Sequence, residues 1–80
     1  MIEQRLQAET EKWLERAKQE RRKINADDKN VDFLKNIDAY MKDAEHFMKS
    51  DDLIRAFEAV IWAWSWLEIG KELGIFRKTD

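Results

Sequence analysis

The residue types that support catalysis or metal binding are few and scattered along this chain. His46 is the single histidine, so a metal site here would need carboxylates such as Asp43 or Asp51 as further ligands. A zinc site needs several convergent ligands, so we expect no metal here and a solvated His46 on a polar helix face. Ser50 and Ser65 have no evident base partner, and there is no glycine-rich phosphate loop. The sequence therefore predicts a protein that is not an enzyme and carries no cofactor.

Length and composition predict one helical domain. The 80 residues are 44% hydrophobic and 40% charged, with no proline and only two glycines. Cysteine is absent, which excludes disulfides and thiolate chemistry and agrees with a cytoplasmic location. No signal-peptide pattern opens the chain, and Arg55, Glu58 and Glu68 interrupt its one strongly apolar run. We expect a soluble cytoplasmic protein with no membrane partner.

Apolar periodicity and turn-forming residues predict three helices, at about residues 2–24, 31–49 and 52–73. Gly74 is expected to end the third helix in a left-handed conformation. The helices match in length, and short connections join antiparallel neighbours. The sequence therefore predicts an all-α, antiparallel up-down-up three-helix bundle that forms a single domain over residues 1–80.

The second and third helices supply most of the predicted core. Large apolar residues recur along one line of each helix at intervals of three and four. Beside the line on the third helix, Ala56, Ala63 and Gly70 are spaced seven apart and form a small-residue groove that faces the bundle. The expected core residues are Phe33, Ile37, Tyr40, Ala44, Phe47, Phe57, Val60, Trp64 and Leu67.

The third helix carries a second apolar stripe, centred about 180° from the first at helical pitch. Its members are Trp62, Trp66, Ile69 and Leu73. One hypothesis is that the first helix covers this stripe through Leu6, Trp13 and Ile24, which would make it ordinary core. The other is that a second copy or another protein covers it, since tryptophan is favoured at association surfaces. A small-molecule pocket is the weakest reading, because no convergent polar groups accompany the stripe.

A group of basic residues near the end of the first helix raises the question of nucleic-acid binding. The group consists of Arg16, Lys18, Arg21, Arg22 and Lys23. Cations at a helix C-terminus also complement the helix dipole, and Glu15 lies three residues before Lys18. The net charge of -2 and the lack of adjacent base-stacking aromatics argue against phosphate binding. A nucleic-acid-binding or nucleotide-metabolism accessory role remains the alternative hypothesis.

Several short motifs occur in order along the second and third helices. Tyr40, the pair Asp43–Ala44 and Phe47 come first, then an acidic turn at Ser50–Asp52, an alanine-rich helix and the closing step Leu73–Ile75. This half of the chain resembles the short archaeal family called domain of unknown function 357. The resemblance implies a compact three-helix bundle in an archaeal protein, and it supplies no reaction, ligand or catalytic residue.

These patterns together predict a non-enzymatic protein-interaction module. We expect it to self-associate, or to bind another protein, through the tryptophan-rich outer face of the third helix. The residues predicted to form that interface are Trp62, Trp66, Ile69 and Leu73.

Overall fold

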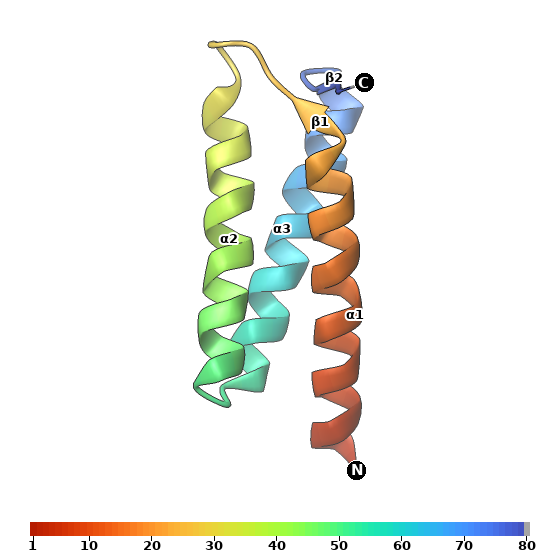
Figure 1. Ribbon diagram of the computed structural model, residues 1–80, viewed down its shortest axis with the longest axis vertical. Coiled ribbons are helices and arrows are strands. Elements are labelled where there is room, and N and C mark those ends of the chain that lie inside the picture. The colour runs from red at the N-terminus through yellow and green to blue at the C-terminus, as the bar shows by residue number, and fades with distance from the viewer. Residues whose placement is uncertain (80) are drawn as a thin grey trace.

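The computed structural model describes residues 1–79, which form three helices with a two-stranded bridge at one end (Figure 1). α1 spans Ile2–Arg22, α2 spans Val31–Lys49 and α3 spans Leu53–Leu73. The strands β1 (Ile24–Asn25) and β2 (Arg77–Lys78) pair antiparallel. The predicted all-α, up-down-up three-helix bundle is confirmed.

The third helix holds the other two together. In Figure 1, α3 passes between α1 and α2, and the first turns of α1 extend beyond the connection from α2 to α3. The small side chains of α3 face the bundle, which lets neighbouring helices approach its backbone closely. These buried small residues are Ala56, Ala59, Ala63 and Gly70.

The seam between α1 and α2 is made largely of charged side chains. Arg21 donates two hydrogen bonds to the carboxylate of Asp38, the shorter at 2.7 Å. Lys18 Nζ lies 3.2 Å from a carboxylate oxygen of Glu45. Because all four side chains are partly exposed, these pairs align the two helices more than they stabilise the fold.

The first helix ends before Ile24, two residues earlier than predicted. The Ile24 side chain is buried, and its backbone pairs with Lys78 in the bridge. Thr79 donates its amide to the Lys23 carbonyl at 2.8 Å and its hydroxyl to the Arg22 carbonyl at 3.1 Å. The C-terminal segment thus satisfies carbonyl groups that the end of α1 would otherwise leave unpaired.

The ends of α3 follow the sequence signals. Asp52 accepts a hydrogen bond from the Arg55 amide at 3.3 Å and caps the first turn. Gly74 has φ +68°, the left-handed conformation expected of it. The chain then turns back, and the ring of Phe76 lies directly against Gly70, where a Cβ atom would overlap it.

The buried face of α2 is rotated from the predicted one by about 60° at helical pitch. Its buried residues are Leu34, Ile37, Met41 and Ala44. Among the other predicted core residues, Val60 and Leu67 are also buried. Five large aromatic residues that we expected in the core are only half-buried, because they lie along the edges where the helices meet. They are Phe33, Tyr40, Phe47, Phe57 and Trp64.

The contact between Gly70 and Phe76 can be tested by Gly70→Ala. Alanine is the better helix former by about 1 kcal/mol. We nevertheless expect a net loss of about 1–3 kcal/mol in the free energy of unfolding, because the new methyl group displaces the ring. Urea unfolding monitored by circular dichroism measures the change.

The control is Gly70→Ala in a Phe76→Ala background, where the methyl group meets no ring and the substitution should be neutral or stabilising. A Gly70→Ala protein as stable as the original chain would contradict the packing described here.

Candidate functional site

One side of α3 leaves five large apolar side chains in contact with solvent. At helical spacing they lie away from the alanine and glycine face that packs in the bundle. Large apolar side chains that gather on one exposed side of a helix can mark an interaction site. We call this surface the outer face; its residues, with their exposed fractions, are Ile54 (68%), Ile61 (46%), Trp62 (53%), Ile69 (45%) and Leu73 (63%).

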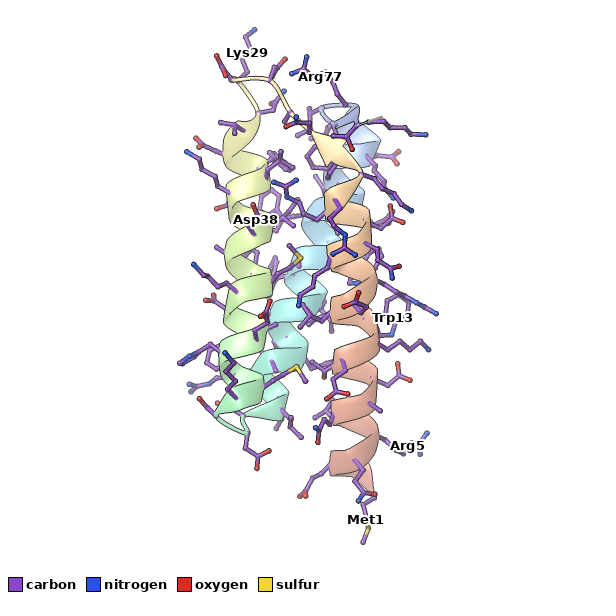
Figure 2. The ribbon with its side chains drawn as sticks, viewed as in Figure 1. Met1, Arg5, Trp13, Lys29, Asp38 and Arg77 are labelled. Atoms are coloured by element: carbon purple, nitrogen blue, oxygen red, sulfur yellow. The ribbon has the colours of Figure 1, made fainter. Side chains whose placement is uncertain are left out.

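An apolar groove of about 640 Å³ runs along the side of α3 that faces α1. Trp13, about halfway along α1, forms one wall (Figure 2). Ile61 and Ile69 belong to both the groove and the outer face, so the two surfaces are continuous. The remaining lining residues are Phe57, Val60, Trp64, Ser65 and Glu68.

The wall at Trp13 is held in place by several contacts. The Trp13 and Trp64 rings meet edge to face at 5.5 Å, and Trp64 Nε1 donates to the Trp13 carbonyl at 2.9 Å. Trp13 Nε1 in turn donates to Glu9 at 3.0 Å, while the Arg16 guanidinium lies 4.7 Å from the Trp13 ring centre. Fixed aromatic walls reduce the entropy lost on binding.

The other two tryptophans take their partners from α2. Trp62 stacks on Tyr40 with ring centres 6.1 Å apart, and Trp66 meets Phe33 edge to face at 4.8 Å. Trp66 is half-buried, and its Nε1 atom is buried without a hydrogen-bond partner. The exposed fractions of Trp62 (53%), Ile69 (45%) and Leu73 (63%) do not favour the hypothesis that α1 covers this stripe and makes it ordinary core.

The predicted interface residues are thus divided. Trp62, Ile69 and Leu73 lie together on the outer face, whereas Trp66 turns toward α2. Sequence reasoning missed Ile54 and Ile61. Their spacing of seven residues places them on one side of a helix, and that signal was available.

The basic residues at the end of α1 each have a partner close by. Lys18 pairs with Glu45, Arg21 with Asp38, and Arg16 stacks on Trp13. Arg22 lies 3.9 Å from Glu15, and Lys23 lies 3.5 Å from Glu20. The pairing of Lys18 and Arg21 with acidic residues of α2 leaves fewer of these cations available and does not favour the alternative in which the group contacts nucleic-acid phosphates.

The sparse chemistry-bearing residues do not converge. His46, Asp43 and Asp51 are exposed, and the Ser65 hydroxyl donates to the Ile61 carbonyl of its own helix. Over residues 1–79, no three histidine, cysteine or acidic side chains are placed to hold a metal ion. Over the same residues, no helix has the length and apolar character needed to cross a bilayer.

Comparison with known proteins connects this arrangement to a family. Residues 5–76 match the family model described as "Protein of unknown function (DUF357)". The crystal structure of protein AF1782 from Archaeoglobus fulgidus, assigned to the same family model, has a TM-score of 0.90 and 46% sequence identity over 99% of this chain and 100% of that one. No curated protein gives a significant match. The match includes α1 as well as the two helices on which the resemblance was based, and the chain belongs to the DUF357 family.

Proposed function

We propose that this protein is a non-enzymatic interaction module that self-associates through the outer face of α3. The observation that carries the proposal is the row of five large apolar side chains exposed on one helix beside an apolar groove. Trp62 alone, about half exposed, would gain about 2–3 kcal/mol if a partner removed the rest of its surface from water. Tryptophan anchors of this kind dominate the energetics of many interfaces.

A second copy is the partner that the charges on α3 favour. Arg55 lies in the first turn of α3, whereas Glu68 and Glu72 lie in its last two turns, and all three are exposed. A two-fold axis perpendicular to α3 would place the α3 helices of the two copies antiparallel. Arg55 of each copy then comes to the same end as the two glutamates of the other, while the apolar side chains meet between them.

The size of the chain also favours association. An 80-residue domain buries only about 60–65% of the surface its unfolded chain exposes, so its own core provides limited stability. Covering the outer face would add buried apolar area without requiring a larger fold. The absence of cysteine and the scattered placement of His46 and the serines support the non-enzymatic role and a cytoplasmic location.

The proposal predicts that a charge on the outer face abolishes self-association. Trp62→Glu and Ile69→Glu should each convert the assembly to monomer, because the new carboxylate would have to be buried without a partner. Sedimentation velocity over a range of protein concentrations measures the change, and far-ultraviolet circular dichroism checks that the helices are retained.

Ile2→Glu is the matched control, since Ile2 is an equally apolar, 81% exposed residue on α1. This variant should associate like the original chain. An original chain that stays monomeric at all concentrations would end the proposal.

The antiparallel arrangement predicts a charge-reversal rescue. Arg55→Glu should weaken the dimer by bringing like charges together at each end, and adding Glu68→Arg and Glu72→Arg to it should restore affinity. Dissociation constants from sedimentation equilibrium at low salt give the comparison. If the triple variant associates no better than Arg55→Glu alone, the copies do not pair in this orientation.

A further inference from the structure

A second hollow, distinct from the outer face, lies where the C-terminal ends of α1 and α3 meet the bridge. It has a volume of about 620 Å³, within the range typical of small-ligand sites. Phe76, which is half-buried, and Ile24, which is largely buried, provide its apolar surface, and Gly74 and Thr79 also line it. The remaining lining residues are charged: Glu20, Lys23, Lys71 and Lys78.

The charges around this hollow are strongly unbalanced. Three lysines face one glutamate, in a chain whose overall net charge is -2. Both oxygens of the Glu20 carboxylate are already engaged, one 3.5 Å from Lys23 Nζ and the other 3.5 Å from Lys71 Nζ. Among residues 1–79, the lining of the hollow therefore carries more positive charge than its glutamate neutralises.

The carboxylate of Glu20 keeps two ammonium groups beside each other. Burial raises the pKa of Glu20, but Lys71 and Lys23 lower it by more, so Glu20 stays ionised at neutral pH. Each ammonium has three N–H donors, and the contact with Glu20 occupies one of them. Both lysines thus retain N–H groups that can donate hydrogen bonds to a bound anion.

The backbones of the three lysines belong to three different elements that meet at the hollow. Lys23 is the C-cap of α1, and Lys71 lies in the last turn of α3. Lys78 lies in β2, where its backbone pairs with Ile24. The three lysines line the same hollow as Ile24 and Phe76.

We propose that this hollow, which we call the lysine pocket, binds a small phosphate-bearing molecule. Its phosphate groups accept hydrogen bonds from Lys23, Lys71 and Lys78, and its planar or apolar part rests on Ile24 and Phe76. A nucleoside diphosphate has this combination of charge and flat ring. The competing explanation is that Lys23 and Lys71 only complement the dipoles of the two helix ends, which would require no ligand.

Amide chemical shifts of the ¹⁵N-labelled full chain, titrated with ADP, pyrophosphate and adenosine at low ionic strength, distinguish these explanations. We expect ADP to shift the amides around Lys23, Lys71 and Lys78 saturably and to bind several-fold more tightly than pyrophosphate. Adenosine should bind much more weakly than either. Binding should weaken as salt is added.

Lys71→Ala and Lys78→Ala should each reduce ADP affinity by about tenfold, the effect of losing one hydrogen bond to a charged group. Lys35→Ala is the control, because Lys35 is an exposed α2 lysine paired only with Asp32 and should leave affinity unchanged. The melting temperature of each variant shows whether the fold is retained.

At about 10 mM ADP, even a binding free energy of about -4 kcal/mol would give visible saturation. If no saturation is seen up to that concentration, the proposal is overturned. Equal losses of affinity in Lys35→Ala and Lys71→Ala would also overturn it, because they would indicate general attraction to surface charge. Equal affinities for ADP and pyrophosphate would overturn the role of Ile24 and Phe76.

Discussion

The close approach of the neighbouring helices to the small residues of α3 determines where the tryptophans of this helix lie. Because alanine and glycine occupy the face that meets the neighbouring helices, its tryptophans have no room there and lie along the two flanks. On one flank Trp62 and Trp66 meet aromatic rings of α2, and on the other Trp64 meets Trp13. The apolar surface that these pairs leave uncovered forms the outer face and the groove.

The weak covering of α3 by α1 follows from the composition of α1. Only Thr10, Leu14 and Ala17 of this helix are buried, and Leu14 is the one large apolar residue among them. Trp13 is therefore its one large contact on the groove side, and α1 meets α2 through charged pairs such as Arg21 with Asp38. A helix with so narrow an apolar stripe can close the bundle on one side but leaves much of α3 exposed.

Local signals in the sequence were sufficient for the fold class and for the ends of α3, because a cap residue or a left-handed glycine acts on its own turn. Features that depend on residues distant in sequence could not be predicted from such signals. Ile24 leaves α1 because Lys78 pairs with it, and no local pattern indicates that contact. Periodicity placed Trp62 and Trp66 on one stripe, but it could not show that Phe33 would draw Trp66 inward while Trp62 stayed exposed. Within the candidate site, Trp13 was likewise unpredictable as a groove wall.

The segment that follows α3, from Gly74 to Phe76, has a structural explanation in this arrangement. The left-handed turn at Gly74 reverses the chain, so Phe76 reaches back to Gly70 and packs edge to face with Phe33 at 6.1 Å. Phe33 also contacts Trp66, whose buried Nε1 lacks a hydrogen-bond partner, a loss of about 1–3 kcal/mol. Edge-to-face aromatic pairs contribute about 0.5–1.5 kcal/mol each. The two pairs that Phe33 forms, with Trp66 and with Phe76, therefore offset much of that loss. The turn therefore completes an aromatic cluster that makes the half-buried Trp66 tolerable, and the Phe76 ring also lines the lysine pocket.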